Sequence, residues 1–535
     1  MKLLKDKKFY IVFICWLFLS IWNFNKPFHF DDTIYLEISQ WIASNPTKPM
    51  SGLINWYGSP QPNYEFNNPR LFMYLQALWG KIFSYDERMF HILISIFLAW
   101  SFVRFYQLCI IFNSKKPNYL SLIFGLSPAL LIGQNVMIDI PLIALWIEFF
   151  YWTLNNNLNY SKRIAISSFI ASIAFLTKYT SILLFPALII NILYSRKLIN
   201  FIWVLVPIVL VLIWSLFNIY DFGKIHLLNL PSKPFWIDKY VETFIGIIVY
   251  TGLISFFLIT TIFSNIKENQ LLNNNIKILV FCGCIIWPSL LILNFFIDIN
   301  KAFFNSIFFI SCLFSGLTII FLVISKNIKK SKKFFLDKKN IILNYWIFSL
   351  PIFMIFFSPF LATRHLLLFT PGLILFFLSD LENLIEIKKK FALFIIFICI
   401  IITNIFAKSD YWQANIYKNH AEIISNDMNN YKNIWFNGNW GWQWYAKKEG
   451  MQHYSVNHSK LRGGDLIVVP KNVFGGIKPD GINLTLLKEY KVKRDKWYKK
   501  FSMLWFYSYF NILSNEKSFF VNDEDAEVFR VYIVN

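Results

Sequence analysis

Two adjacent carboxylates, Asp31 and Asp32, lie a few residues beyond the first long apolar run of this chain, in the stretch HFDDTIYLEISQWI (29–42). Neighbouring carboxylates repel each other, and near a lipid bilayer they are poorly solvated. Such a pair is costly to keep unless the protein uses it. The chemistry open to an aspartate at this place is proton transfer, in which the carboxylate accepts the proton of a reacting hydroxyl group.

Other ionisable residues also lie at the edges of apolar runs. Asp139 occurs in NVMIDIPLIALW, where Pro141 marks a helix start, and Lys178 falls between two short apolar runs in FLTKYTS. Arg364 and His365 open a later run, TRHLLLFTPGLIL. Lysine and arginine bind phosphate by charge-assisted hydrogen bonds, and arginine has the better bidentate geometry. These residues can act together only if they occupy the same side of a membrane.

The composition is that of a polytopic membrane protein. Hydrophobic residues make up 56% of the 535 positions, mean hydropathy is +0.46, and charged residues are only 16%, against about a quarter in soluble domains. With about 20 apolar residues per span, the sequence predicts thirteen spans. Their ranges are 8–24, 89–113, 118–134, 136–155, 164–176, 179–194, 198–220, 241–264, 276–297, 302–325, 341–360, 364–383 and 391–407.

The first predicted span follows the basic stretch MKLLKDKK and ends in Trp22 and Phe24 instead of small residues. This pattern predicts an uncleaved signal anchor. All six cysteines lie inside apolar runs, which indicates neither a disulfide framework nor a zinc site.

The net charge of +21 is distributed unevenly between the loops on the two sides of the predicted membrane. With the N-terminus in the cytoplasm, the inner loops contain 22 Lys and Arg residues and the outer loops between spans contain 11. This asymmetry follows the positive-inside rule, so the charge gives no reason to expect nucleic acid as a partner. An odd number of spans places residues 408–535 on the periplasmic or extracellular face of a bacterial inner membrane.

Two outer segments are long enough to contribute to function. The first, 25–88, contains two amphipathic stretches, 31–43 and 69–83, which we expect to be helices lying in the membrane interface, joined by a Pro- and Asn-rich loop. The second, 408–535, is less apolar and should form a small soluble α/β domain next to a transmembrane domain of residues 1–407. Strand-like runs occur at 465–470 and 528–535.

Six elements, in order along the chain, resemble those of the GT-C glycosyltransferases of the protein-mannosyltransferase and aminoarabinose-transferase type (glycosyltransferase families 39 and 83). The roughly thirteen spans of that family agree with the number predicted from the chain. The matching stretches are DDTIY, NNPRLFMYLQALWGKIFSYDERMFHILISIF, GLSPALLIGQNVMIDIPLIALW, AFLTKYTSILLFP, TRHLLLFTPGLIL, and WFNGNWGWQWYAKKEGM with GGDLIVVP.

The resemblance implies transfer of a sugar from a polyprenyl-phosphate carrier to an acceptor at the outer membrane boundary. Asp31 matches the family's acidic position, so we expect it to be the general base. Asp32, where relatives usually carry Glu, would position the acceptor or share the charge of Asp31. The alternative is that Asp31 is only the N-cap of the interfacial helix.

The resemblance also implies that Asp139 is a site residue that orients the donor sugar or an ion. The alternative is that Asp139 only stabilises a helix N-terminus, where a negative charge is favourable. Lys178 and Arg364 are the candidates for binding the donor phosphate, and interfacial snorkelling is the alternative for both. The chain departs from the family at Asn68-Pro69-Arg70, which could shift phosphate recognition to Arg70 and leaves the donor sugar open.

Candidate sugar- or acceptor-binding residues are Tyr35, His365, Trp440 and Trp442, since aromatic faces suit the C–H surfaces of sugars. For the tryptophans, packing in the core of a small domain is the alternative. We expect no tightly bound metal, because fewer than three aligned ligands are evident, and leave a loosely held divalent cation open.

A transporter or flippase of a lipid-linked or small solute would share the thirteen spans and basic inner loops. Transporters tend to show internal repeats and ionisable residues near mid-membrane, whereas this chain has no convincing repeat and its ionisable residues lie at the outer boundary. A glycan polymerase or ligase would usually depend on later arginine and histidine chemistry. The acceptor class, whether lipid, cell-surface glycan such as lipopolysaccharide, or protein, is not specified by the sequence.

The charge asymmetry predicts opposite sidedness for two positions. Reporter fusions after residue 335 and after residue 535 should report the cytoplasm and the outer face, respectively. The same sidedness for both fusions would refute this topology and the placement of the ionisable residues at the outer boundary.

Overall fold

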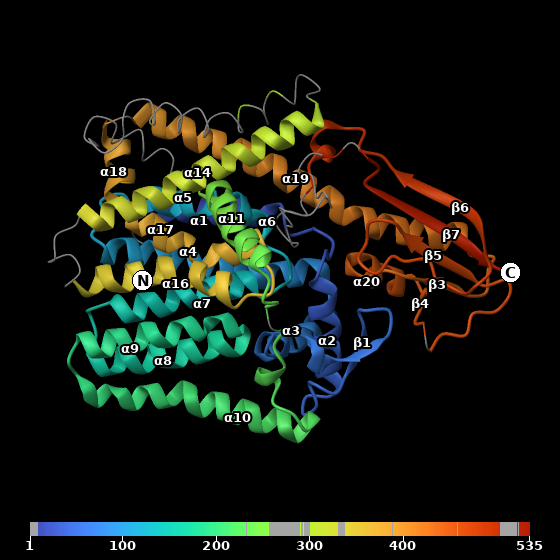
Figure 1. The fold of residues 1–535 in the computed structure, drawn as a ribbon, viewed down its shortest axis with the longest axis horizontal. Coiled ribbons are helices and arrows are strands. Elements are labelled where there is room, and N and C mark those ends of the chain that lie inside the picture. Colours follow the sequence, from blue (N-terminus) through green and yellow to red (C-terminus); the bar gives the residue numbers. More distant parts are fainter. Residues whose placement is uncertain are drawn as a thin grey trace.

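The computed structural model describes residues 9–231, 233–255, 289, 293, 300–329, 337–387, 389–456, 458–502, 522 and 524–535. A bundle of helices forms most of this part of the chain, and a small mixed sheet lies beside one end of the bundle (Figure 1). The helical membrane architecture with a small α/β segment at the C-terminus is as predicted.

Helices occupy twelve of the thirteen predicted spans. They are α1 (Phe9–Ile21), α4 (Glu87–Ile111), α5 (Pro117–Gly125), α6 (Pro128–Ile132), α7 (Asp139–Leu154), α8 (Tyr160–Thr177), α9 (Leu184–Tyr194), α10 (Leu205–Phe222), α11 (Ile237–Ile254), α14 (Lys301–Lys329), α16 (Lys338–Phe356), α17 (Thr370–Phe376), α18 (Leu378–Ile387) and α19 (Lys389–Asp427). Short 3₁₀ helices precede α9, α10 and α17. Of the described helices, five are long and apolar enough to cross a membrane without a break: Glu87–Ile111, Leu198–Phe222, Phe303–Ile328, Lys338–Phe356 and Lys389–Asp427.

The structure corrects the predicted spans in detail. The span predicted at 118–134 is two short helices, because Pro128 starts the second and cannot donate a hydrogen bond to the preceding turn. The span at 364–383 is likewise divided, with Pro371 in the first turn of α17. The span predicted at 276–297 lies outside the described residues except for two positions.

Helix α7 lies at the centre of the bundle, packed between α4 and α8 (Figure 1). All but two of its 16 residues are buried. A helix that is apolar on every face is expected in such a position. Because α7 is enclosed, its first residue, Asp139, is held in a fixed place at one end of the bundle.

Glycines allow α11 and α14 to approach each other closely. A Cβ atom on Gly252 would lie 2.0 Å from the carbonyl oxygen of Cys312, and one on Gly316 would collide with the carbonyl oxygen of Ile248. Small residues at such crossings let helix backbones pack directly in a membrane, where apolar burial gives little driving force between helices.

The first outer segment folds as predicted into two helices, α2 (Asp32–Ser44) and α3 (Leu71–Phe83), which pack against each other. Leu71, Leu78 and Ile82 of α3 form an exposed apolar stripe, as an interfacial helix requires. Between the helices lies a hairpin of β1 (Leu53–Asn55) and β2 (Pro60–Pro62), which the sequence analysis describes only as a loop.

The C-terminal segment contains a five-stranded sheet in the order β4-β3-β5-β7-β6. Its strands are β3 (Ile434–Phe436), β4 (Gln452–His453), β5 (Leu466–Pro470), β6 (Leu484–Val492) and β7 (Glu527–Val534), and α20 (Trp440–Lys448) follows β3. The two runs predicted as strands are β5 and β7, which pair antiparallel.

Helix α19 carries this segment. It continues without a break across the predicted domain boundary at 407/408, so the change in composition falls inside one helix. Asp410 of α19 forms a buried ion pair with Lys26, with Nζ and Oδ2 3.0 Å apart. Breaking a buried pair costs about 3 to 5 kcal/mol. This contact therefore joins α19 firmly to the start of the first outer segment.

Further contacts hold α20 against α2. Glu37 of α2 accepts hydrogen bonds from Gln443 at 2.9 Å and from Lys447 at 2.7 Å. The phenol of Tyr445 accepts a hydrogen bond from the backbone N–H of Phe28 at 2.8 Å. Glu37 thus attaches α2 to α20, and the two outer segments lie on the same side of the bundle (Figure 1).

Candidate active site

A cavity of about 420 Å³ opens at the end of the bundle that carries residues 25–88, between this segment and the ends of α7, α8 and α16. It contains four of the charged residues that the sequence singles out, Asp31, Asp139, Lys178 and Arg364, together with a broad apolar wall. Its main lining residues are Asp31, Ile34, Tyr35, Trp56, Tyr57, Asn67, Asn68, Asp139, Lys178, Tyr179, Thr180, Leu227, Leu230, Leu350, Phe353, Met354, Phe357, Ser358, Phe360, Arg364 and His365.

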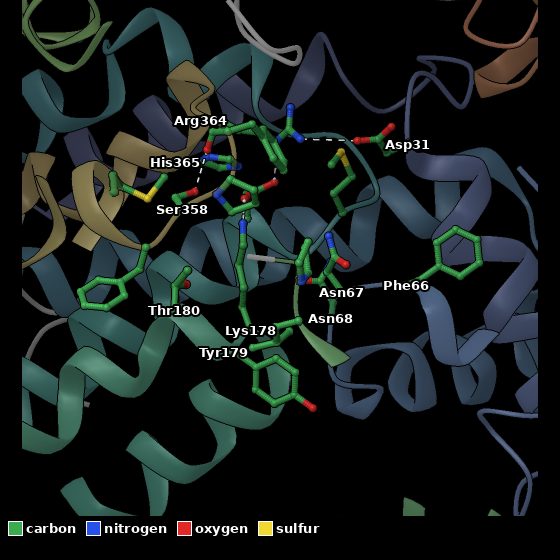
Figure 2. A pocket seen from close by; sticks show the side chains of 18 of the residues that line it. Asp31, Phe66, Asn67, Asn68, Lys178, Tyr179, Thr180, Ser358, Arg364 and His365 are labelled. Carbon is green, nitrogen blue, oxygen red and sulfur yellow. Dashed lines mark hydrogen bonds and ion pairs between the residues drawn. The ribbon is translucent and has the colours of Figure 1, made fainter. Parts of the chain in front are cut away.

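Four charged side chains form a chain of ion pairs in this cavity. Lys178 Nζ donates to Asp139 Oδ1 at 3.1 Å, and Arg364 Nε lies 3.4 Å from Asp139 Oδ2. Arg364 Nη2 lies 3.4 Å from Asp31 Oδ2, and Figure 2 shows this pair together with Lys178. Two cations and two carboxylates thus balance each other, and Arg364 joins the two acids.

The position of Asp31 is set by the turn before α2. Asp31 is the N-cap residue, but its side chain makes no capping hydrogen bond. The capping alternative therefore does not account for this aspartate. Phe30 has φ of +47°, a strained left-handed conformation for a bulky residue. Its ring packs 5.1 Å from that of Trp440, centroid to centroid. This kink leaves the Asp31 carboxylate 35% exposed in the cavity.

The two cations reach the cavity from breaks between helices. Lys178 has extended backbone dihedrals between α8 and the 3₁₀ turn Tyr179–Leu183. Arg364 lies in the 3₁₀ turn Thr363–Leu368, ahead of α17. Arg364 is only 7% exposed, and its Nη1 is buried without a hydrogen-bond partner in the described part of the chain. Both side chains point into the protein, which is the opposite of snorkelling.

Asp32 points away from Asp31. Consecutive residues of an α-helix are about 100° apart around its axis, and Asp32 is fully buried outside the cavity lining. Its Oδ2 accepts the backbone N–H of His29 at 2.8 Å. The structure therefore places Asp32 beneath the site, away from where an acceptor would contact it.

The protein environment makes both aspartates weaker acids. Burial raises the pKa of Asp31, Arg364 opposes this shift, and the charge of Asp139 adds to it. Burial also raises the pKa of Asp32, to about 7, against the His29 N–H bond and the charge of Lys26. A carboxylate with a raised pKa is a stronger base when it is ionised, which suits Asp31 for accepting a proton.

Arg70 lies outside the cavity lining, in contrast to its predicted role in phosphate binding. Its guanidinium is fully buried and donates to the carbonyl oxygens of Asn63, Phe66 and Asn68. These bonds fix the loop before α3. Arg70 therefore holds in place the loop that brings Asn67 and Asn68 to the cavity.

The predicted sugar-binding residues divide into two groups. Tyr35 and His365 line the cavity, and Tyr35 Oη accepts a hydrogen bond from Asn68 Nδ2 at 3.0 Å. Trp440 and Trp442 do not line it. Trp442 is fully buried, packs 4.9 Å from the ring of Phe529 and donates to a backbone carbonyl. It is a core residue of the C-terminal segment, as the alternative interpretation holds.

Several residues that line the cavity were not predicted from the sequence. Trp56 and Tyr57 come from the hairpin, Asn67 and Asn68 from the loop before α3, and Ser358 from the loop after α16. Asn67 and Asn68 fall within the NNPR stretch that carries the family resemblance, which is a usable signal. The hairpin residues lie in a Pro- and Asn-rich stretch whose local pattern indicates only a loop.

The described residues give no evidence for a metal site built from clustered side chains. Within the described ranges, no group of three or more His, Cys, Asp or Glu side chains could hold a metal ion. The two acids of the cavity are instead neutralised by Arg364 and Lys178. A loosely held divalent cation stays a prediction that metal dependence of the reaction would test.

The fold is similar to those of solved membrane enzymes. ArnT from Cupriavidus metallidurans, solved with undecaprenyl phosphate bound, is 12% identical over 79% of this chain and 71% of its own, with a TM-score of 0.45. The Archaeoglobus fulgidus oligosaccharyltransferase, tethered with an acceptor peptide, is 10% identical, with a TM-score of 0.46. AglB from the same archaeon, in complex with an inhibitory peptide and a dolichol-phosphate, is 12% identical, with a TM-score of 0.48.

This chain spans 64% of the length of the two archaeal chains, just under two thirds, and they match 84% of it. No family model and no curated protein matches the sequence. The solved neighbours are GT-C glycosyltransferases, the type that the sequence resembles. Likeness at 10% to 12% identity with TM-scores below 0.5 does not decide the reaction, which has to follow from the side chains in the cavity.

The raised pKa of Asp32 predicts a pH-dependent stability. The folded state holds a proton on this carboxyl up to about pH 7, whereas the unfolded chain releases it near the ordinary value of 3.8. Because the folded state binds more protons between these values, this group makes stability fall as pH rises through that range. Asp32→Asn, which keeps an oxygen for the His29 N–H, should raise the Tm of the detergent-solubilised protein more at about pH 8 than at about pH 5.

The matched control for this prediction is Asp427→Asn. Asp427 is exposed and pairs with Lys488, and its hydrogen bonds with Lys488 and Tyr490 lower its pKa. It should therefore show no stabilisation at high pH. An equal change in Tm for Asp32→Asn at both pH values would contradict the assignment of a raised pKa to Asp32.

Proposed function

We propose that this protein is a membrane glycosyltransferase that moves a sugar from a polyprenyl-phosphate carrier to an acceptor at the outer face of the membrane. The observation that carries the proposal is the accessible carboxylate of Asp31 beside two cations, Arg364 and Lys178, in one cavity at the end of the helix bundle. A base and an anion-binding pair are the two devices that this reaction needs.

The reaction balances with these groups. The acceptor hydroxyl oxygen forms a bond to the anomeric carbon of the sugar, and the bond from that carbon to the phosphate oxygen breaks. The hydroxyl proton passes to Asp31, and the electron pair leaves with the polyprenyl phosphate. The leaving phosphate carries its charge without protonation, so cationic hydrogen-bond donors suit it better than an acid.

Arg364 and Lys178 have donors left for this phosphate. Lysine has three N–H donors and arginine has five, whereas these residues use one or two each on Asp139 and Asp31. Asp139 keeps the two cations together by neutralising part of their charge. In the proposed reaction, Asp139 orients the cations and does not itself exchange a proton.

The apolar wall of the cavity suits a lipid-linked donor. Leu227 and Leu230 line one part of it, and Phe353, Met354 and Phe357 at the end of α16 line another. A phosphate next to an apolar surface is the pattern of a lipid phosphate, in which the head group meets cations and the chain meets hydrocarbon. A soluble nucleotide sugar has no hydrocarbon chain to bury, so contact with this wall would not strengthen its binding.

Asp31→Asn tests the base. Asparagine caps helices well and the native side chain makes no capping bond, so the variant should accumulate with an unchanged Tm. Loss of a general base should reduce transfer by about a hundred- to ten-thousandfold. In cells lacking the gene, wild-type protein should restore the missing glycan sugar, detected by mass spectrometry, and Asp31→Asn should not.

Near-normal transfer by Asp31→Asn would remove Asp31 from the mechanism. Movement of a solute across liposomes by the purified protein, with no glycosyl transfer from any polyprenyl-linked donor, would overturn the transferase proposal as a whole. The glycan analysis would also identify the transferred sugar and the acceptor class.

Arg364→Ala tests the phosphate site. Its binding of undecaprenyl phosphate in nanodiscs should weaken by about ten- to a hundredfold, the value of one or two charge-assisted hydrogen bonds. Arg364→Lys should be intermediate, because it keeps the charge and loses the planar fork. Asp31→Asn should bind at least as tightly as wild type, because a repelling carboxylate is neutralised.

Arg88→Ala is the matched control for the phosphate site. Arg88 is an exposed arginine of the same outer segment that donates to Asn25 outside the cavity, and its loss should leave lipid binding unchanged. Equal affinity of wild type and Arg364→Ala would exclude Arg364 as the phosphate ligand.

A further inference from the structure

Two aromatic side chains from distant parts of the sequence meet beside the cavity. Tyr57, from the turn of the β1–β2 hairpin, and Phe474, from the loop after β5, have ring centroids 6.1 Å apart and planes at 87°. Tyr57 is 63% exposed and Phe474 is 44% exposed. Single exposed apolar side chains need no explanation, but these two rings are in contact and form one exposed aromatic surface.

The hairpin is held by backbone contacts on both sides of its turn. Gly58 has φ of +83°, a conformation that glycine adopts without strain, and it lets the chain reverse directly after Tyr57. Asn55 Nδ2 donates to the carbonyl of Tyr454 at 2.9 Å, and the N–H of Val456 donates to the carbonyl of Gly58 at 3.2 Å. The turn is therefore attached to the C-terminal segment.

Asn439 positions both aromatic residues. Its Nδ2 donates to the carbonyl of Trp56 at 2.5 Å, and its backbone N–H donates to the carbonyl of Phe474 at 2.9 Å. Asn439 is almost fully buried, so these bonds are shielded from water. One residue of the NGNWGWQWY stretch therefore sets the places of Tyr57 and Phe474 relative to each other.

Tyr57 connects the aromatic pair to the cavity of the proposed base, and Phe474 packs on Tyr57 from outside the cavity lining. Trp56 and Tyr57 line the same cavity as Asp31, and Asn67 is an exposed amide in that lining. Partial burial, and then the charge of Asp31, raises the pKa of the Tyr57 phenol. The surface next to Asp31 thus combines aromatic faces with amide hydrogen-bonding groups.

We infer that Tyr57 and Phe474 form an acceptor subsite that takes the ring of a carbohydrate and presents one of its hydroxyl groups to Asp31. This inference rests on the proposed function and adds to it that the acceptor is itself a sugar. The aromatic surface that the sequence places at Trp440 and Trp442 is supplied instead by the hairpin and the loop after β5.

The chemistry of the subsite favours a sugar over a lipid chain. Sugar rings have apolar C–H faces that pack on aromatic rings and hydroxyl groups that bond to amides and carboxylates. An acyl chain would match the aromatic faces but would leave the charge of Asp31 and the amide of Asn67 against hydrocarbon, which is unfavourable. The continuous apolar wall lies instead on the side of α16.

The test uses full-length protein in nanodiscs with saturating undecaprenyl phosphate, and methyl α-glucopyranoside and methyl α-mannopyranoside as probes. Saturation-transfer-difference NMR should detect the ring protons of at least one glycoside with wild type and with Tyr57→Phe, which keeps the aromatic face. Tyr57→Ala and Phe474→Ala should each reduce the signal several-fold. Leu53→Ala and Ile477→Ala, exposed apolar residues of the same hairpin and loop, are the matched controls and should behave as wild type.

Absence of a glycoside signal with wild type, or an undiminished signal in both alanine variants, would overturn the subsite. If undecaprenyl phosphate still bound in an Arg364-dependent manner, the proposed function would stand without it. If the lipid phosphate failed to bind while the alanine variants lost the glycoside signal, the carbohydrate subsite would stand and the proposed donor would fall. Tm values equal to wild type would exclude unfolding as the cause of a lost signal.

Discussion

The site depends on the ability of one carboxylate, Asp139, to hold two cations inside the protein. Arg364 and Lys178 come from turns far apart in the sequence, and without an acid between them they would repel each other in a medium of low dielectric constant. Asp139 can serve both because it is the first residue of a long helix that is buried on nearly every side. The position of the cations, and through Arg364 that of Asp31, follows from the burial of α7.

Much of this arrangement follows from the sequence. The charges of the loops predict which edges of the apolar runs share one side of the membrane, and a charged residue at such an edge is costly enough to suggest a function. That reasoning selects four residues that the structure brings into contact: Asp31, Asp139, Lys178 and Arg364. The strands at 465–470 and 528–535 follow from runs rich in β-branched and aromatic residues.

The site features that the sequence did not predict correctly depend on tertiary contacts, which leave no trace in a local sequence pattern. Arg70 looks free to bind an anion until the loop before it folds back and supplies three carbonyl oxygens. Trp442 looks like a binding residue because a tryptophan-rich stretch suits a sugar and a small core equally well, and only the packing against Phe529 decides. Tyr57 and Phe474 are more than four hundred residues apart, and their meeting depends on two hydrogen bonds of Asn439.

The uninterrupted course of α19 has a mechanical consequence. A helix of 39 residues is about 58 Å long at 1.5 Å per residue, roughly twice the hydrocarbon thickness of a bilayer. About half of it therefore extends beyond the bilayer as one continuous helix. The ion pair between Lys26 and Asp410 attaches this helix to the first outer segment. Because α19 is continuous from Lys389 to Asp427, it offers no hinge at the membrane surface about which the sheet could rotate.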